Sequence, residues 1–464
     1  MSRDPVLMSA TELLANYRAK TLSPVEVTQA VFVRITDLNP FLNPFCLVDE
    51  AGALAAARES EQRWQRGEPR GRVDGVPVSV KDLVLSKGWP TLRGSKLVAR
   101  DQAWDEDAPA VARLREKGAI LLGKTTTPEF GWKGVTDNPL TGVTRNPWNP
   151  GMTPGGSSGG AAVAAATGMG PLHIGTDGGG SIRIPSAFTG IFGFKPSHGR
   201  VPAYPLSPFG TLAHLGPMTR TVADAALMLN VLTQPDARDW YALPPENRDY
   251  LDGLDNGVKG LRVAFAPTLA KAPVDAEVAA LVAAAAKSFG ELGAIVEEAT
   301  PDLPDSTETF SRHWLAGAAN VLRAFSAEQR QQIDPGLVEI AAQGATIPLL
   351  DYLAAVKERE AMGVTMNSFH QTWHLLLTPT IPIPAFAAGR ELPVGHGGKR
   401  WWDWTPFTYP FNLTRQPAAT VPCGFTKAGL PVGLQIVGAL YDDARVLRAA
   451  RAFEQAHPFR LPVK

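Results

Sequence analysis

The feature that most constrains the fold of this chain is an alternation. Short apolar runs alternate with segments in which apolar residues recur at helical spacing. The apolar runs at 75–80 and 119–122 flank a helical segment at 108–117, and a run at 261–265 precedes a helical segment at 276–292. Alternation of strand and helix predicts an α/β fold with a mixed sheet that helices cover on both faces.

Three zones of different texture follow one another along the 464 residues. Residues 1–70 have helical spacing, 71–232 alternate strand-like and helical runs, and 233–464 resume the alternation after a polar connection. Strand candidates lie in both of the last two zones, so one sheet built from distant segments and two separate domains both fit the pattern. We predict a single large domain over 1–464 with one central sheet.

Composition excludes several function classes. Lys plus Arg and Asp plus Glu both number 45, so the net charge is zero and gives no electrostatic argument for nucleic acid or an anionic membrane. Two cysteines are too few for a disulfide framework or a cysteine-based zinc site. Neither a signal peptide nor an apolar stretch long enough for a membrane span is visible. We expect a cytoplasmic monomer or homodimer without a metal.

Two glycine–serine segments carry the chemical information. They occupy 155–160 and 175–183 and lie beside apolar runs rather than in a polar stretch. Glycine next to a core is typical of backbone that adopts positive φ or approaches a ligand closely. A flexible linker is therefore the weaker interpretation.

Two generic motifs match formally, but their context argues against both. Residues 155–159 fit the Gly-x-Ser-x-Gly elbow, which needs a preceding strand, whereas 146–154 contains three prolines. Residues 118–125 fit the P-loop pattern, but the variable positions read Ala-Ile-Leu-Leu, whose amides belong to a strand. Lys124 is then expected to be a structural or surface residue at the end of that strand.

Gly178, Gly179 and Gly180 precede Ser181 and offer consecutive backbone N–H groups. Such a nest can hold the oxyanion of a tetrahedral intermediate, with Ser181 as the attacking group. Serine needs a base, and no His–Asp pair is legible among the eight histidines, although such pairs can be distant in sequence. Lys81 follows an apolar strand directly, and desolvation there would lower its pKa.

These residues make the chain resemble the amidase signature family, and the bacterial amidases most. Fatty acid amide hydrolase and the A-type component of the tRNA-dependent amidotransferase are more distant members. The agreement covers nearly the whole chain, which makes it more specific than any single motif. The matching stretches are 75–82, 118–130, 146–148, 154–160, 175–185, 193–196 and 412–438.

The resemblance implies a Ser-Ser-Lys catalytic set. Ser181 ends the family's Asp-x-Gly-Gly-Ser stretch and is the nucleophile, Ser157 lies 24 residues earlier and is the bridging serine, and Lys81 is the base. A cis peptide bond is expected before Ser157. Neutral Lys81 would take a proton through Ser157 as Ser181 attacks, and the acyl-enzyme would then be hydrolysed. The resemblance implies no metal and no organic cofactor.

The loop around the nucleophile receives roles in the same way. The N–H groups of 178–181 map to the oxyanion hole, and Asp177 and Arg183 match residues that brace the loop. Ser158 is interpreted as a structural hydroxyl. Two positions depart from the family: Gly178 stands where Thr or another side chain is common, which should loosen the loop slightly, and Arg415 stands where Gly is common.

The implied substrate is a carboxylic amide, and esters, aryl acylamides and carbamates share its reactive carbonyl. Selectivity should reside in 306–360 and 390–410, which the resemblance does not determine. Tryptophans near these stretches are either core residues or an aromatic wall for an acyl or amine group. They are Trp132, Trp314, Trp401, Trp402 and Trp404.

Two rival functions remain. The A-type component of an amidotransferase usually carries a Tyr-Asp-Gly-Val-Arg-Tyr-Gly-like segment in the region corresponding to 305–330, and this chain has no such match there. A catalytically silent member used as a binding module conflicts with the presence of Ser181, Ser157 and Lys81 together.

Overall fold

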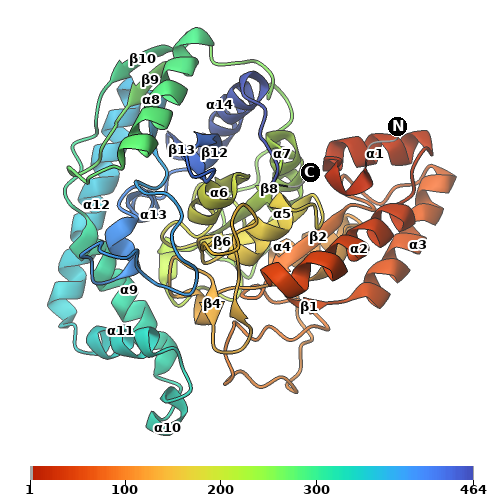
Figure 1. The fold of residues 1–464 in the computed structure, drawn as a ribbon, viewed down its shortest axis with the longest axis horizontal. Coiled ribbons are helices and arrows are strands. Elements are labelled where there is room, and N and C mark those ends of the chain that lie inside the picture. Colours follow the sequence, from red (N-terminus) through yellow and green to blue (C-terminus); the bar gives the residue numbers. More distant parts are fainter. Residues whose placement is uncertain (1–3, 463–464) are drawn as a thin grey trace.

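The computed structural model describes residues 4–462, whose largest feature is an eleven-stranded mixed sheet (Figure 1). Its strand order is β1-β3-β2-β6-β8-β7-β12-β13-β11-β9-β10. The strands are β1 (Phe45–Val48), β2 (Pro77–Lys81), β3 (Ile120–Thr125), β6 (Leu172–Asp177), β7 (Phe192–Lys195), β8 (His214–Thr219), β9 (Arg262–Phe265), β10 (Ile295–Glu298), β11 (Leu375–Pro379), β12 (Ala418–Phe425) and β13 (Pro431–Gly438). A separate two-stranded sheet pairs β4 (Asp137–Asn138) with β5 (Gly142–Val143).

Helices α1–α3 lie at one end of the sheet and α9–α12 at the other (Figure 1). The α-helices are α1 (Ala10–Ala19), α2 (Pro24–Leu42), α3 (Glu50–Arg66), α4 (Pro109–Glu116), α5 (Gly159–Ala166), α6 (Arg183–Thr189), α7 (Val222–Leu232), α8 (Ala276–Glu291), α9 (Thr307–Leu322), α10 (Ala327–Arg330), α11 (Pro335–Ala345), α12 (Leu349–Thr372), α13 (Pro410–Leu413) and α14 (Asp443–Ala456). Short 3-10 turns include η2 (Glu129–Gly131), η3 (Gly210–Leu212) and η4 (Trp401–Trp404).

Local sequence signals explain where several helices begin. Ser23 and Glu26 form the reciprocal capping box that opens α2, with Pro24 at its first position. Thr221 accepts a hydrogen bond from the Asp224 N–H and caps α7. Helix α5 reads Gly-Gly-Ala-Ala-Val-Ala-Ala-Ala and is buried throughout, because small side chains let it pack closely on the sheet.

One antiparallel strand pair joins the early and late zones of the chain. In it β7 pairs with β12, so that Lys195 lies opposite Ala418. Strand β2 runs parallel to β3 and β6, whereas β6, β8 and β7 pair in antiparallel fashion. The prediction of one mixed sheet assembled from distant segments is confirmed.

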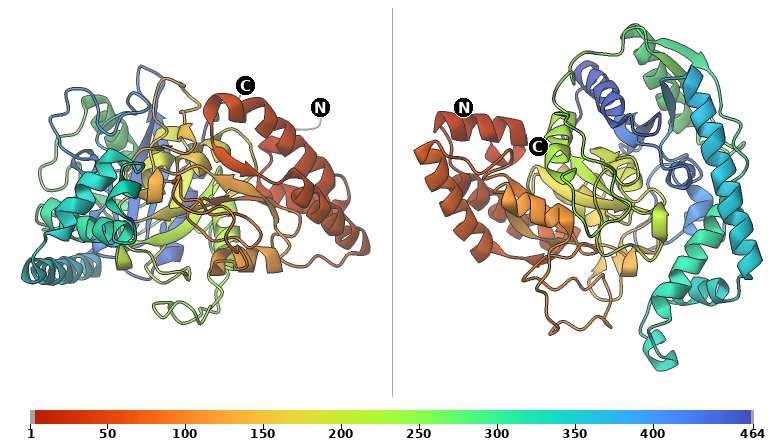
Figure 2. Two further views of the ribbon diagram at one scale, coloured as in Figure 1. Left: turned by 90° about the horizontal axis from the view of Figure 1, so that it is seen from below. Right: turned by 180° about the vertical axis from the view of Figure 1, so that it is seen from behind.

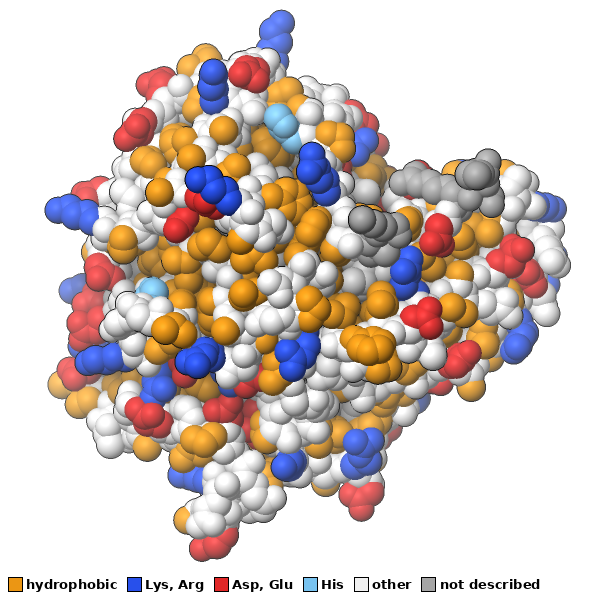
Figure 3. All heavy atoms as spheres, viewed as in Figure 1, with side chains coloured by type: hydrophobic (Ala, Val, Ile, Leu, Met, Phe, Trp, Pro, Cys, Tyr) orange, Lys and Arg blue, Asp and Glu red, His pale blue; other side chains and the backbone are white. Residues whose placement is uncertain are grey.

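Both faces of the sheet are covered, by different helices (Figure 2). In β11, Leu375 and Leu377 belong to the large core cluster that includes α7, α8 and α14, while Leu376 packs on the opposite face with Met366 of α12. This alternation follows from the two-residue period of a strand. On the outer surface, acidic and basic side chains are interspersed (Figure 3).

Two sequence predictions need correction. The strands β1, β7 and β8 were not expected, and Gly193, Gly216 and Pro217 explain why two of them look unlike strands. Strand β3 extends to Thr125, beyond the expected end at residue 122, and its Lys124 is fully buried, which favours the structural over the surface interpretation of that residue. Among residues 4–462, no helix has the length and apolar character to cross a membrane.

Candidate active site

Lys81 is the last residue of β2, and three hydroxyl groups surround its side-chain nitrogen. Nζ lies 2.6 Å from Ser157 Oγ, 2.8 Å from Ser158 Oγ and 2.8 Å from Thr176 Oγ1. The Lys81 side chain is fully buried. Sequence reasoning selected Lys81, Ser157 and Ser158 but missed Thr176, which stands next to Asp177 at the end of β6.

These surroundings lower the pKa of Lys81 well below the ordinary lysine value of 10.5. Burial is the main cause, because a low-dielectric interior disfavours the cation. The carboxylate of Asp177 acts in the opposite direction and raises this pKa. Burial prevails, so the neutral amine forms at a lower pH than in an exposed lysine.

The two serines before α5 are fixed by their backbone and by the neighbouring strand. The Gly156–Ser157 peptide bond is cis, as expected. Ser158 Oγ lies 3.1 Å from the carbonyl oxygen of Thr176 and 3.2 Å from its N–H nitrogen, which anchors the pair to β6. The Ser158 N–H donates to the carbonyl oxygen of Ser181 at 3.1 Å, so the two glycine–serine segments lie side by side.

The loop from Gly178 to Ser181 follows β6 directly. The Gly180 N–H donates to Asp177 Oδ1 at 2.7 Å, so this amide is already occupied and not free for an oxyanion. Within residues 4–462, no protein acceptor meets the N–H groups of Gly178, Gly179 or Ser181. The loop therefore presents three free donors, one fewer than the sequence predicts.

Gly180 is the one position of this loop whose backbone requires glycine. Its φ of 132° lies in the region that side chains disfavour, and a Cβ atom would stand 2.5 Å from Thr408 Oγ1. That hydroxyl instead donates to the carbonyl oxygen of Gly179 at 2.7 Å. Contacts from the late part of the chain thus hold the loop closely.

Asp177 and Arg183 form a buried ion pair under the loop. Arg183 donates through Nε and Nη2 to the two carboxylate oxygens, both at 2.9 Å, and neither side chain is exposed. Burial alone would raise the pKa of Asp177, but the Arg183 guanidinium outweighs it and holds this pKa well below its usual range. The bracing contact that the sequence predicted is present.

Three further residues complete this brace, and the sequence reasoning gave none of them a role. Arg183 also donates to the carbonyl oxygen of Thr408 at 2.8 Å, to Gln435 Oε1 at 2.8 Å and to Asn412 Oδ1 at 2.6 Å. Asn412 Nδ2 in turn donates to Asp177 Oδ1 at 2.8 Å. Asn412 and Gln435 lie inside the stretch that resembles the family, which was the available signal.

Aromatic side chains from both predicted selectivity stretches cover the glycine loop. Trp314 of α9 packs against Gly178, while Phe310 and Trp401 pack against Gly179. All three aromatic side chains are almost completely buried, with Trp314 at 2% exposure. Trp314 and Trp401 therefore lie at the candidate site.

The other three tryptophans lie further from the glycine loop. Trp132 follows Gly131, whose ideal Cβ position is 3.6 Å from Ser157 Oγ, and its ring lies against Gly336 of α11. Trp402 meets Phe310 edge-on at 6.4 Å between ring centroids. Trp404 stacks on Phe188 at 6.0 Å and donates through Nε1 to the carbonyl oxygen of Glu391, which is a packing role.

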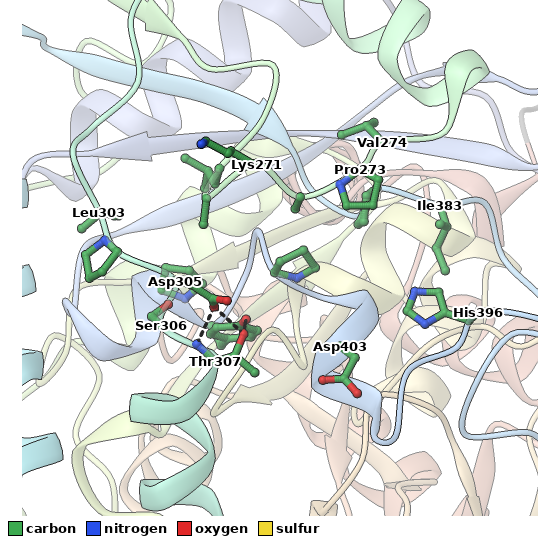
Figure 4. Close-up of a pocket in the computed structure, with 18 of the residues that line it drawn as sticks. Lys271, Pro273, Val274, Leu303, Asp305, Ser306, Thr307, Ile383, His396 and Asp403 are labelled. Carbon is green, nitrogen blue, oxygen red and sulfur yellow. Dashed lines mark hydrogen bonds between the residues drawn. The ribbon is translucent and has the colours of Figure 1, made fainter.

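A cavity of about 630 Å³ lies apart from the candidate site, since none of Lys81, Ser157 or Ser181 lines it (Figure 4). Lys271, Asp305, His396 and Asp403 are among its labelled lining residues. Tyr409 also lines it and stacks on Phe310 at 4.6 Å. The stacked pair of Tyr409 and Phe310 thus connects the wall of this cavity to the glycine loop, because Phe310 packs against Gly179.

Comparison with known proteins decides the family, because the model of the amidase family matches residues 26–447. The chain belongs to the amidase family. This amidase-family chain is 40% identical to an acylamidase of Rhodococcus erythropolis, over 97% of its own length and 96% of the relative's. It is 37% identical to the A-type component of the glutamyl-tRNA(Gln) amidotransferase of Myxococcus xanthus strain DK1622, over 97% and 98% of the two chains.

Solved structures of amidase signature enzymes share its fold. A bacterial aryl acylamidase of that family superimposes with a TM-score of 0.91 at 34% identity, covering 97% of this chain and 96% of the other. A 6-aminohexanoate cyclic dimer hydrolase in complex with substrate gives 0.87 at 29% identity, covering 98% and 99%. The resemblance drawn from the sequence is therefore confirmed.

Proposed function

We propose that this chain hydrolyses carboxylic amides through an acyl-enzyme on Ser181. The observation that carries the proposal is the Lys81 amine, buried among three hydroxyls, one of which is Ser157 at 2.6 Å. Burial disfavours the charged form of Lys81, and the Ser157 hydroxyl beside it offers a path for a proton, so together they suit this lysine to act as a base.

In the proposed reaction Ser181 Oγ attacks the carbonyl carbon while its proton passes to Ser157. Ser157 gives its own proton to neutral Lys81, so neither serine has to form a free alkoxide during the attack. When the tetrahedral intermediate collapses, the proton returns through the same two groups to the leaving nitrogen. Water then hydrolyses the acyl-enzyme by the same route.

The negative oxygen of the intermediate would be held by the free N–H groups of Gly178, Gly179 and Ser181. Gly180 contributes by fixing the loop through its bond to Asp177. Preorganised donors of this kind stabilise an oxyanion without reorganisation, and removing one such donor typically raises the barrier by about 3–4 kcal/mol.

The substrate class is a small molecule with an acyl group on an amine, including aryl amines. An acylamidase and an aryl acylamidase are among the relatives, and aromatic rings surround the loop. Balanced charge gives no support for a nucleic-acid partner. Esters and carbamates present the same carbonyl and belong to the range to be assayed.

The purified chain tests this function directly. It should hydrolyse short-chain anilides without any partner protein, and a fluorophosphonate should label Ser181, as read by mass spectrometry of peptides. Ser181→Ala should abolish both signals. Hydrolysis that persists in Ser181→Ala would contradict the assignment of the nucleophile.

The amidotransferase components among the relatives make a second function worth excluding. Under that function the isolated chain would leave anilides intact and act only after partner proteins and a mischarged tRNA are added. Residues 306–314 here begin helix α9 and supply Phe310 and Trp314 to the glycine loop. This use of the region favours a hydrolase of small amides.

A further inference from the structure

We propose that Gly178 and Trp314 form a steric pair that limits the size of the acyl group this enzyme accepts. The inference rests on the proposed function and adds the determinant of its substrate selectivity. Residue 178 is a glycine although its backbone conformation does not require one. The φ of Gly178 lies outside the left-handed region, so the absence of a side chain must have another cause.

That cause is the Trp314 ring. A Cβ atom on residue 178 would stand 3.0 Å from Trp314 Cζ3 and 3.3 Å from Cη2, which is closer than normal packing allows. The far end of the indole therefore occupies the volume that a side chain at 178 would fill. The surface of Gly178 is therefore covered closely by an aromatic side chain.

Trp314 cannot easily turn away from this position. Its Nε1 donates to the carbonyl oxygen of Trp132 at 3.0 Å. The ring stacks on Phe209 at 3.9 Å between centroids and on Phe310 at 5.4 Å, and Trp401 meets it edge-on at 5.2 Å. Stacked and edge-on contacts of this kind define one geometry for the ring.

The proton path indicates which part of the substrate meets this wall. The leaving nitrogen must take its proton from Ser157, which lies beside Gly131 at 3.6 Å from that residue's ideal Cβ position. The oxyanion points at the free amides, and Ser181 Oγ forms the new bond. The acyl substituent is the one group left, and in the proposed geometry it lies next to the aromatic residues that cover Gly178 and Gly179. Trp314 is thus a specificity determinant for the acyl chain.

The test compares p-nitroanilides of acetate, butyrate and isobutyrate, with a second series in which the acyl group stays acetyl and the amine varies. Trp314→Phe shortens the ring at its contact with Gly178. We expect the kcat/KM ratio of butyryl to acetyl substrate to rise about tenfold or more, since a methylene in an apolar pocket typically changes selectivity by this amount. The amine series should keep its order.

A matched control is Trp404→Phe, which also removes a buried indole whose Nε1 bonds a backbone carbonyl, here that of Glu391. It should leave the butyryl-to-acetyl ratio at the wild-type value. Fluorophosphonate labelling of Ser181 in each variant shows that the site is folded.

A second measurement enlarges the other member of the pair, Gly178. Gly178→Ala places a methyl group against Trp314 and should lower kcat/KM for the acetyl substrate by about tenfold, because overpacking displaces the loop. In Gly178→Ala combined with Trp314→Phe this loss should shrink, since the shorter ring makes room for the methyl.

Three outcomes overturn the pair while leaving the proposed function standing. The first is a Trp314→Phe variant that still reacts with the fluorophosphonate but keeps the wild-type butyryl-to-acetyl ratio of kcat/KM. The second is a Trp314→Phe variant that changes its preference among amines and not among acyl groups. The third is a double variant whose loss of kcat/KM equals the sum of the two single losses in free energy. A wild-type chain that neither hydrolyses the series nor reacts with the fluorophosphonate overturns the proposed function itself, and this inference with it.

Discussion

Two fully buried lysines stand one residue apart in register on neighbouring parallel strands, and only one of them has the proposed catalytic role. Lys124 of β3 lies opposite Val80 of β2, and Lys81 is the next residue along β2. Partners across a ladder share a face and successive residues alternate, so the two side chains project to opposite faces of the sheet. Lys81 points toward α5, and Lys124 points toward the loop after β2.

Burial lowers the pKa of both lysines, so burial alone does not make a base. The pKa of Lys124 falls to about 8, mainly through desolvation, with Asp82 as the principal opposing influence. Its Nζ contacts the carbonyl oxygen of Val84 together with Ser86 Oγ at 3.2 Å and Thr91 Oγ1 at 2.9 Å. These partners all belong to the loop after β2, and none of them lies in the segments that contain Ser157 or Ser181.

The hydroxyls around Lys81 differ because they connect onward to the nucleophile segment. Ser157 and Ser158 precede α5, and the Ser158 N–H bonds the Ser181 carbonyl. What distinguishes a catalytic lysine here is a hydroxyl that can pass a proton toward Ser181. Three substitutions test this difference, and a fourth tests the ion pair of Asp177 and Arg183 beneath the neighbouring loop.

The largest expected effect follows Lys81→Met. Turnover of a short-chain anilide should fall at least about 10³-fold, because the only base of the relay is lost. The urea midpoint should stay close to wild type, since the three hydroxyls can bond one another. Retention of more than a few per cent of wild-type turnover would contradict the role of Lys81 as base.

Asp177→Asn should reduce the free energy of unfolding by about 3–5 kcal/mol at neutral pH, because it leaves Arg183 buried without its counter-charge. Since the folded pKa of Asp177 is depressed, its contribution is present above the unfolded carboxyl pKa and is lost as pH falls. Urea unfolding should therefore show the gap between variant and wild type narrowing below about pH 4. A gap that is constant with pH would contradict the ion-pair account.

Lys124→Met should lower the stability and leave the turnover largely unchanged, which is the reverse of the effect expected for Lys81→Met. We expect a loss of about 2–3 kcal/mol in unfolding free energy, because a buried carbonyl and two hydroxyls lose their partner. The kcat of the folded fraction, normalised to fluorophosphonate-labelled sites, should stay near wild type. A collapse of normalised kcat would show that the two lysines are not functionally distinct.

The smallest effect is expected from Thr176→Val, which removes one of the three hydroxyls near Lys81 and keeps the shape. The charged form of Lys81 loses a hydrogen-bond acceptor, so its pKa should fall further. The acidic limb of the kcat/KM profile, which reports protonation of the base, should move to lower pH by up to about one unit. A shift to higher pH would mean that Thr176 stabilises the neutral amine.

Residues of the candidate site were predictable where the signal is local. Lys81 ends an apolar run, Ser157 and Ser181 stand in glycine-rich segments, and the helices with capping signals begin where their sequences indicate. The strands β7 and β8 escaped because their glycines and proline weaken the strand pattern, and pairing with distant segments is what extends them.

The remaining site residues depend on contacts between distant parts of the chain. Neither Asn412 nor Gln435 has a local pattern that points to Arg183. The close contact of Trp314 with Gly178 was not predictable for the same reason, because Trp314 lies far away in the sequence. The occupied amide of Gly180 likewise depends on where the Asp177 side chain turns.

The brace of Arg183 by Asn412 and Gln435 has a consequence for synthesis of the chain. All three Lys81-facing hydroxyls and the nucleophile are translated in the first half of the chain, but the contacts that fix Arg183 come from residues 408–435 of 464. When the ribosome has synthesised the residues of the proposed proton path, the residues 408–435 that hold Arg183 have not yet been synthesised. The full set of Arg183 contacts under the Ser181 loop can therefore form only after residues 408–435 have been synthesised.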